Sequence, residues 1–300
     1  MNSRHLLSLS DLSKLDIERL IERAIVLKRW RETGHKPIIL ESKVLIMIFE
    51  EPSTRTRVAF EVAMNELGGS TVFLSSKDSQ LGRGEPIEDT ARVLSRMANI
   101  IMIRTDAHET VQKLAKFSDV PVINGLTNDY HPCQLLADLT TFFEHRGDIT
   151  GKTVAWIGDG NNMCNSYIEA SKIMGFSLKI ACPSAYRPKL GKEDSNVSFV
   201  SDARSAAEDS DLVVTDVWLS MGQRNEKNFS KHKNFREFQV DMNIFDFAKS
   251  DALFMHCLPA HRGEEVSNSV IEHPRSVVWD EAGNRLHSQK AVLEFLLASK

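Results

Sequence analysis

The chain has 300 residues, of which 42% are hydrophobic and 26% charged, with a net charge of −4. Because this length exceeds that of a typical single domain, two domains of an α/β or α+β type are expected. The weak negative charge gives no support for a nucleic-acid or membrane-surface binder, and no apolar run approaches the roughly 18 to 20 residues of a membrane helix.

Four cysteines, at 133, 164, 182 and 257, show neither CxxC pairing nor zinc-finger spacing. A structural metal site is therefore not expected, and a chain of this size needs no disulfide to fold. The first twenty residues lack a basic segment followed by an apolar core, so no signal peptide is predicted. These features favour a reducing cytoplasm.

The first half alternates short apolar runs with segments of helical period. Residues 12–30 form an amphipathic pattern, with apolar residues recurring at helical spacing. Strands are predicted at 43–50, 70–76, 99–105 and 120–126, with helices at 57–69, 87–98 and 109–118 between them. Strands without polar alternation, separated by helices, indicate a parallel sheet covered on both faces.

A long helix is predicted over 131–147, with Pro132 in its first turn, where a missing N–H costs nothing. The alternation then restarts, with strands at 152–160, 177–183, 211–218 and 252–258 and helices at 165–175 and 244–250. A last helix closes the chain at 289–300, and its packing does not follow from local pattern. The restart predicts two α/β domains joined near residues 132–150.

The stretch STRTR, residues 53–57, directly follows an apolar strand. Ser53 or Thr54 is well placed to cap the next helix, and a helix start is a ready anion site. Arg55 is the predicted phosphate ligand. Arg57 points to nearly the opposite side and is expected to pair with a carboxylate elsewhere in the fold. An ordinary capped helix with solvent-facing arginines remains the alternative.

Three further polar features of the first half are candidates for ligand binding. The glycine-rich stretch 75–86 follows a strand and is either a loop that closes over a ligand or a plain surface loop. Arg104 ends a strand, where ligands gather in doubly wound sheets. His131 and Gln134 are three residues apart at a helix start and so share a face.

In the second half, GDGNN at 158–162 resembles a dinucleotide fingerprint, but Met163 stands where GxGxxG requires glycine. A nicotinamide site is therefore disfavoured. Asp216 and Cys257 each follow a buried strand, and no sequence feature marks Cys257 as a nucleophile. Arg285 is expected just before the last helix, where it is a surface arginine if taken alone.

Six motifs occur in a specific order: STRTR (53–57), SQLGRGE (79–85), HPCQ (131–134), GDGNN (158–162), DVWLSMG (216–222) and HCLPAHRG (256–263). Together they resemble the aspartate/ornithine carbamoyltransferase family over the length of the chain. DVWLSMG and HCLP match the ornithine branch rather than the aspartate branch. The fold that follows is α/β, with two doubly wound parallel-sheet domains linked by long helices.

The resemblance also implies the domain roles and partners. Residues 1–132 would bind carbamoyl phosphate, residues 150–285 would bind ornithine, and the C-terminal helix, about 287–300, would return to the first domain. The family is built on a catalytic homotrimer with active sites shared between subunits. Gln80 matches a residue that reaches into a neighbouring subunit's site.

The resemblance assigns site residues in two groups. The carbamoyl-phosphate group comprises Ser53, Thr54, Arg55, Thr56, Gln80, Arg104, His131, Gln134, Cys257, Leu258 and Arg285. The ornithine group comprises Asn162, Asp216, Ser220 and Met221. The expected catalytic residues are Arg55, Arg104, His131 and Cys257.

The chemistry agrees with this set. A neutral δ-amine must attack a carbonyl carbon, which requires donors on the developing oxyanion (Arg104, His131, Thr56) and a cation on the leaving phosphate (Arg55). Asp216 and Asn162 suit the amino and carboxylate ends of ornithine. No metal, cofactor or covalent intermediate is required by this reaction.

Other functions stay open on the sequence. Putrescine or an N-acylated ornithine could be the acceptor amine. A non-catalytic phosphate-ligand sensor on the same fold and an NAD-dependent enzyme, suggested by GDG alone, are rivals from other classes. The direction of the reaction and association beyond a trimer are not encoded in the motifs.

Overall fold

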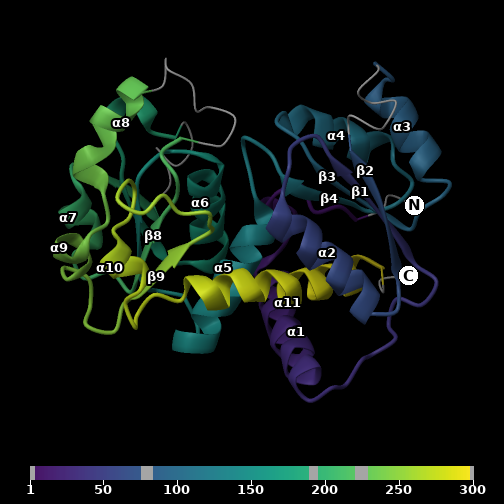
Figure 1. The fold of residues 1–300 in the computed structure, drawn as a ribbon, viewed down its shortest axis with the longest axis horizontal. Coiled ribbons are helices and arrows are strands. Elements are labelled where there is room, and N and C mark those ends of the chain that lie inside the picture. The colour runs from purple at the N-terminus through teal and green to yellow at the C-terminus, as the bar shows by residue number, and fades with distance from the viewer. Residues whose placement is uncertain (1–3, 76–83, 189–194, 220–228, 298–300) are drawn as a thin grey trace. The chain divides into compact units, whose positions relative to one another are not determined.

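The computed structural model describes residues 4–75, 84–188, 195–219 and 229–297. The chain divides into two compact units, which we call unit 1 (Met1–Thr140 with Gly283–Lys300) and unit 2 (Thr141–Ala282). Each contains one parallel sheet with helices between successive strands (Figure 1). The predicted fold class, α/β with two parallel-sheet domains, is confirmed.

Unit 1 holds a four-stranded sheet in the order β2-β1-β3-β4. Its strands are β1 (Val44–Phe49), β2 (Ser70–Ser75), β3 (Ile100–Arg104) and β4 (Val122–Leu126), all in parallel pairs. Its helices are η1 (Leu9–Asp11), α1 (Lys14–Glu32), α2 (Thr54–Glu66), α3 (Ile87–Leu94) and α4 (His108–Phe117).

The central strands of unit 1 are buried because their residues are apolar on both faces. In β1 and β3, Leu45 and residues 46–49 and 100–103 are all at most 5% exposed. Each such aliphatic side chain contributes about 1.5–3 kcal/mol through burial. This core fixes where β1 and β3 end, and the polar residues that follow them are therefore held at the sheet's carboxyl edge.

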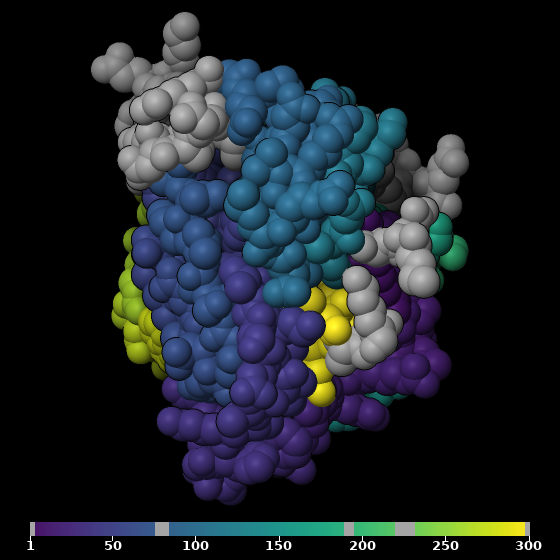
Figure 2. Space-filling view, turned by 90° about the vertical axis from the view of Figure 1, so that its right-hand side faces the viewer, coloured from purple at the N-terminus to yellow at the C-terminus, as the bar shows by residue number. Residues whose placement is uncertain are grey.

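The two ends of the chain meet within unit 1. The Arg23 guanidinium bonds Glu294 at 2.7 Å, and Arg4 lies 4.2 Å from the centre of the Phe295 ring. Figure 2 shows N-terminal residues in purple beside C-terminal residues in yellow on this face. Segments nearly 300 residues apart in sequence thus belong to one folding unit.

Unit 2 holds a five-stranded parallel sheet in the order β7-β6-β5-β8-β9. Its strands are β5 (Thr153–Ile157), β6 (Ser177–Ala181), β7 (Val197–Val200), β8 (Leu212–Thr215) and β9 (Leu253–His256). Its helical segments are α6 (Asn162–Met174), η4 (Ser184–Tyr186), α7 (Ala203–Ala207), α8 (Phe229–Phe235), η7 (Arg236–Phe238), α9 (Met242–Phe245) and α10 (Asn268–Ile271).

Two long helices run from one unit into the other along the chain. α5 (Pro132–Arg146) begins at the predicted proline, and α11 (Val278–Leu297) ends in unit 1. α11 begins at Val278, nine to eleven residues before the predicted starts at about 287 and 289, so Arg285 lies inside it rather than before it. Gly283 and Asn284 weaken the local helical signal, since both have low helix propensity, and the contacts of Arg285 with distant residues compensate in the folded chain.

The strand β7 was not predicted. Its sequence, VSFV, is short and only partly buried at the edge of the sheet, so it carries neither a long apolar run nor a clear alternation. Among the described residues, no helix is long and apolar enough to cross a membrane.

Candidate active site

The first polar cluster lies at the start of α2, immediately after β1. Ser53 is in an extended conformation and its hydroxyl accepts the Thr56 N–H at 3.3 Å, the expected geometry of a helix cap. Thr56 is only 1% exposed and Arg55 is partly buried. The helix start therefore holds hydroxyls and a guanidinium beside N–H groups that α2 itself does not use.

Arg57 points away from this cluster, as predicted, but its carboxylate partner is not elsewhere in the fold. Its Nε bonds Glu61 on the same helix at 2.9 Å, and its guanidinium lies 3.8 Å from the centre of the Phe73 ring. The side chain of Glu61, one turn along, is the closest carboxylate that a surface arginine of α2 can reach. Arg57 thus forms an ion pair at the surface, in an environment that differs from that of Arg55.

The second cluster lies where β3 ends, beside β1 in the sheet. Arg104 is the last residue of β3, and its carbonyl accepts the N–H of Glu50 at 2.9 Å. The Thr105 hydroxyl donates to the Glu50 carboxylate. The chain passes from β1 to β2 on one side and returns to β3 on the other, so this edge is the sheet's topological switch point, where ligands bind in such folds.

A buried hydrogen-bond network joins α2, α5 and α11 within unit 1. Arg285, 3% exposed, donates from Nη1 to the Gln134 side-chain oxygen at 2.5 Å and from Nη2 to the Thr56 hydroxyl at 3.0 Å. Gln134 in turn donates to the Asp138 carboxylate at 2.8 Å. Arg285 therefore fixes the positions of Thr56 and Gln134, residues that lie far apart in the sequence.

His131 lies directly before α5 and is 4% exposed. Burial lowers its pKa well below the usual 6.5, and the positive charges of Arg285, Arg104 and Arg55 lower it further. The imidazole is therefore neutral near pH 7. A neutral ring among three guanidiniums can donate a hydrogen bond to a carbonyl oxygen without adding to the positive charge.

Cys133 stands beside His131 in the same motif but is chemically quiet. It is 1% exposed, its thiol donates to the Asn124 carbonyl at 3.4 Å, and burial raises its pKa to about 12. A thiol held neutral in this way is neither a nucleophile nor a metal ligand near pH 7.

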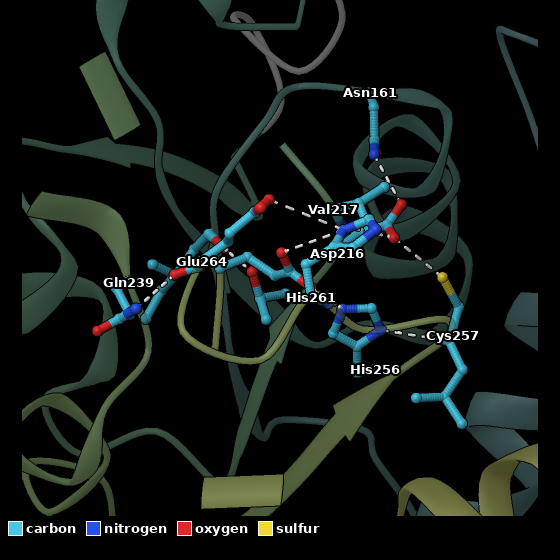
Figure 3. Close-up of polar contacts among 12 residues, drawn as sticks. Asn161, Asp216, Val217, Gln239, His256, Cys257, His261 and Glu264 are labelled. Carbon is cyan, nitrogen blue, oxygen red and sulfur yellow. Dashed lines mark hydrogen bonds and ion pairs between the residues drawn. The ribbon is translucent and has the colours of Figure 1, made fainter. Parts of the chain in front are cut away.

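In unit 2 the polar residues gather after β5, β8 and β9, again at a switch point, because β5 and β8 are neighbours in the sheet. Asp216 follows β8 and is 8% exposed. It accepts the Asn161 amide at 2.7 Å, the Val217 N–H at 2.8 Å and the Cys257 thiol at 3.2 Å (Figure 3). The carboxylate is thus held in one orientation from three sides.

Asn161 is the residue of this cluster that the sequence reasoning missed. It caps α6, its side-chain oxygen accepting the N–H groups of Met163 at 3.0 Å and Cys164 at 3.1 Å, while its amide bonds Asp216. Asn162, the predicted ornithine residue, bonds the Met163 N–H through its own side-chain oxygen at 3.0 Å. Capping chemistry in GDGNN was the available signal, since asparagine is a preferred cap.

The segment that follows β9 is shaped by buried groups. Leu258 has φ +55°, in the left-handed region that non-glycine residues rarely adopt. Its N–H donates to His256 Nδ1 at 2.9 Å, so the proton of that ring is on Nε2, 3.1 Å from Glu265. The Glu281 carboxylate accepts the His256 N–H at 2.9 Å. Glu265 and Glu281 thus orient His256, which in turn holds Leu258.

The structure places the other predicted residues only in part. Within unit 1, Ser53, Thr56, Arg55, Arg104, His131, Gln134 and Arg285 come together through the contacts and charges given above. Thr54 is the exposed first residue of α2. Gln80, Ser220 and Met221 lie outside the described residues. Asp138, which holds Gln134, carried no distinguishing sequence signal because it is one polar residue within a long helix.

Comparison with known proteins identifies both halves of the chain. Residues 4–144 match the family model of the aspartate/ornithine carbamoyltransferase carbamoyl-P binding domain, and residues 150–296 match that of the Asp/Orn binding domain. Ornithine carbamoyltransferases of Acinetobacter baumannii and Methylococcus capsulatus are 57% and 58% identical to the chain. They cover 99% and 100% of it, and the chain covers 98% and 100% of them.

Solved structures agree. The ornithine carbamoyltransferase of Burkholderia thailandensis is 50% identical with a TM-score of 0.91, covering 98% of both chains. That of Pyrococcus furiosus is 46% identical with a TM-score of 0.94, covering 99% of this chain and 98% of its own. The likeness therefore extends over both units.

Proposed function

Because the chain belongs to the aspartate/ornithine carbamoyltransferase family, we propose that it transfers the carbamoyl group of carbamoyl phosphate to the δ-amine of L-ornithine, giving L-citrulline and phosphate. Unit 1 binds carbamoyl phosphate and unit 2 binds ornithine. Relatives that are 56–58% identical to the chain are ornithine carbamoyltransferases, which favours ornithine over aspartate as the acceptor.

One observation carries the proposal: the charges of Arg55, Arg104 and Arg285 act together on a buried, neutral His131. Three cations near one uncharged ring make this part of unit 1 strongly positive in a polypeptide whose net charge is −4. A phosphate dianion offsets this charge and suits the planar hydrogen-bonding fork of arginine. The N-terminus of α2 adds N–H donors and the positive end of the helix dipole.

Within this pocket the residues take distinct roles. Ser53, Thr54, Arg55 and Thr56 hold the phosphate at the helix start, where Arg55 stabilises the charge of the leaving group. Arg104 and His131 donate to the carbonyl oxygen and stabilise the oxyanion. Arg285 and Gln134 complete the pocket through the bonds that already join them.

The reaction is a direct displacement at the carbonyl carbon. The neutral δ-nitrogen forms the new C–N bond, the carbonyl electrons move to oxygen, and the tetrahedral intermediate collapses by breaking the C–O bond to phosphate. The nitrogen loses a proton and phosphate leaves with the bonding pair. Since an alkylamine is mostly protonated near pH 7, productive binding selects the neutral amine, and rate comes from positioning and preorganised donors.

Ornithine is held at the carboxyl edge of the sheet in unit 2. Asp216 is oriented by Asn161 and Cys257 and presents a carboxylate to the α-ammonium group. Asn162, Ser220 and Met221 complete the ornithine site, and Cys257 and Leu258 are proposed to contribute to binding of carbamoyl phosphate. The thiol of Cys257 acts as a hydrogen-bond donor to Asp216 and forms no covalent intermediate.

The assembly we propose is a homotrimer in which Gln80 contributes to a neighbouring subunit's site. Unit 1 exposes several large apolar side chains that an interface would cover, among them Ile38, Val58 and Val72 at 71%, 52% and 44%. A cytoplasmic location is supported by the four cysteines, all of them free thiols. Native mass determination tests the trimer.

The proposed activity is tested by incubating the protein with carbamoyl phosphate and ornithine and measuring citrulline. Arg55→Gln is expected to lower turnover roughly 10²–10³-fold, the usual effect of removing one electrostatic donor from the transition state. Arg57→Gln is the matched control, two residues along the same helix, and should change turnover less than about threefold, because exposed ion pairs contribute little.

Two results would overturn the proposal: no citrulline above background from the unmodified protein, or equal losses in the two variants. An acceptor panel with putrescine and N-acetylornithine resolves the remaining choice of substrate. Putrescine lacks the α-carboxylate, and N-acetylornithine lacks a free α-amine. Both should react far more slowly than ornithine if Asp216 and Asn162 bind those groups.

A further inference from the structure

A cluster of two imidazoles and two carboxylates lies in unit 2, apart from the residues assigned above. The atoms of His261, Glu264 and Glu265 that could bind a metal lie within 4.8 Å of one another. His261 Nδ1 is 3.8 Å from Glu265 Oε2 and 4.0 Å from Glu264 Oε2. His232 Nε2 reaches the same Glu264 oxygen at 3.8 Å.

Within this cluster, Glu265 is fully buried and one of its carboxylate oxygens has no hydrogen-bond partner. It is 0% exposed, and its Oε1 accepts both the His256 ring and the His261 N–H. Its Oε2 is buried and has no hydrogen-bond partner, as is also true of His261 Nδ1, the ring atom nearest to it. A buried carboxylate oxygen without a partner is unfavourable unless a cation or donor meets it.

Basic side chains do not meet this need. Among the described residues, Glu265 makes no ion pair with a lysine or arginine. The neighbouring Arg262 is directed to Glu272 at 2.7 Å and to the Asn268 side chain. The carboxylate of Glu265 therefore faces the imidazole rings of His256 and His261 rather than a lysine or arginine.

Backbone conformation and hydrogen bonds fix the turn that carries the cluster. Gly263, with φ +89°, makes the tight turn between His261 and Glu264 that a residue with a side chain would resist. Gln239 donates to the carbonyls of Gly263 and Glu264 at 2.8 and 2.6 Å, and the Glu265 carbonyl accepts the Val240 N–H at 2.9 Å. Figure 3 shows Gln239 directed at this turn, close to the labelled Glu264 and His261.

His232 approaches from α8. Its ring packs edge-to-face on Trp218 with centroids 5.8 Å apart, which limits its rotation. His232, His261 and Glu264 are each about a quarter to a third exposed. The cluster thus combines one buried ligand with three side chains that are partly exposed to solvent.

The donor set suits a tetrahedral metal site. Zinc bonds to imidazole nitrogen and carboxylate oxygen are about 2.0–2.2 Å long, which separates two ligands of one ion by roughly 3.4 Å. His261 lies 3.8 to 4.0 Å from the two carboxylates, and the ligand atoms of His261, Glu264 and Glu265 all lie within 4.8 Å of one another, so these three can close on one ion by side-chain rotation. His232 contacts only Glu264 of the three, at 3.8 Å, and would turn toward the ion as the fourth ligand. Two nitrogens and two oxygens suit Zn²⁺ better than Mg²⁺ or Ca²⁺, which prefer oxygen alone.

We propose that His232, His261, Glu264 and Glu265 form a binding site for a divalent transition metal, with Zn²⁺ as the natural occupant. The ion joins α8 to the turn after β9 and supplies the cation that buried Glu265 needs. Its role is structural, and through Glu265 and His256 it would also stabilise the segment that carries Leu258. The spacing of cysteines, which excluded a zinc finger, carries no information about such a site.

The test is binding of the metal alone to the full chain. Titration with Zn²⁺ by calorimetry is expected to give about one site per chain and a rise in melting temperature, because an ion that binds only the folded state stabilises it. His232→Gln and Glu264→Gln should each weaken Zn²⁺ binding at least about tenfold. Glu272→Gln, the same substitution on an exposed carboxylate of unit 2, is the matched control and should leave binding unchanged.

A second measurement separates this cluster from Asp216, His256 and Cys257, which also lie within 4.8 Å of one another. Co²⁺ bound by nitrogen and oxygen gives only weak visible bands, whereas a thiolate ligand adds a strong near-ultraviolet charge-transfer band. Visible bands without the thiolate band, lost in His232→Gln, support the proposal. A thiolate band lost in Cys257→Ser, unchanged Zn²⁺ affinity in both cluster variants, or no binding at all would overturn it.

Discussion

Replacing Arg285 with glutamine separates its part in folding from its part in ligand binding. The side chain is 3% exposed and makes two hydrogen bonds, to Gln134 and Thr56. Each bond from a charged donor contributes about 1.5–3 kcal/mol. Removing a buried charge also removes its desolvation penalty, so we expect the free energy of unfolding without ligand to fall by no more than about 2 kcal/mol.

The effect on carbamoyl phosphate should be larger. We propose that Arg285 also contacts carbamoyl phosphate, and loss of one such charge-assisted contact, worth about 1.5–3 kcal/mol, corresponds to a rise of roughly 10- to 150-fold in KM for carbamoyl phosphate. The pKa of His131 should also rise, because one of the three cations that lower it is gone. Citrulline formation at saturating ornithine gives KM, and NMR titration of the ring gives the pKa.

Arg285→Lys is the internal control. It keeps the charge but cannot span Gln134 and Thr56 together, because an ammonium lacks the planar fork of a guanidinium. An intermediate KM is expected, with the pKa of His131 still low. The reasoning is refuted if Arg285→Gln folds normally and leaves the KM for carbamoyl phosphate within about twofold of its original value.

Three further substitutions test other parts of the structure. Asn161→Ala should lower the free energy of unfolding by about 1–2 kcal/mol through loss of the α6 cap. Asn161→Ser keeps a capping oxygen and should lower the free energy of unfolding by less than about half of that amount. Chemical denaturation measures both values. Both substitutions should raise the KM for ornithine, because each deletes the amide group that bonds Asp216. An unchanged KM would show that Asn161 does not support ornithine binding. Asp216→Asn should raise the KM for ornithine roughly 10- to 100-fold, the value of one charge-assisted hydrogen bond, while the KM for carbamoyl phosphate stays nearly constant; parallel rises in both would instead indicate a general structural defect. His287 is 7% exposed, and burial, with the charges of Lys290 and Lys28, lowers its pKa from 6.5 to about 4. Between these values the unfolded chain binds a proton that the folded chain does not, so stability is lost as the pH falls below 6.5, by about 2 kcal/mol at about pH 5. In urea unfolding, the free energy of unfolding of His287→Gln should fall by about 2 kcal/mol less than that of the unmodified protein between about pH 7 and pH 5. Equal falls in the two proteins would contradict the lowered pKa of His287.

Local patterns in the sequence were sufficient for much of the fold. The apolar runs that became β1, β3, β5 and β8 are strands buried on both faces, a pattern visible without tertiary information. Pro132 and Ser53 marked helix starts correctly, because capping and first-turn preferences depend on a few neighbouring residues. Once parallel sheets are predicted, polar residues after strands are expected at one edge, which is where Arg104 and Asp216 lie.

What local pattern could not supply are contacts between residues far apart in the chain. Arg285 read as a surface arginine, yet it is buried against Gln134 and Thr56, which are 151 and 229 residues away. The early start of α11 has the same origin, since tertiary contacts outweigh the weak helix propensity of Gly283 and Asn284.

The sequence by itself thus determined the order of strands and helices, the capped helix start after β1 and the motifs that name the family. Only the tertiary structure decided which charges meet, because burial and electrostatic interaction depend on distances that topology creates. It is the folded chain that gives His131 three cationic neighbours and leaves the buried Oε2 of Glu265 facing His261.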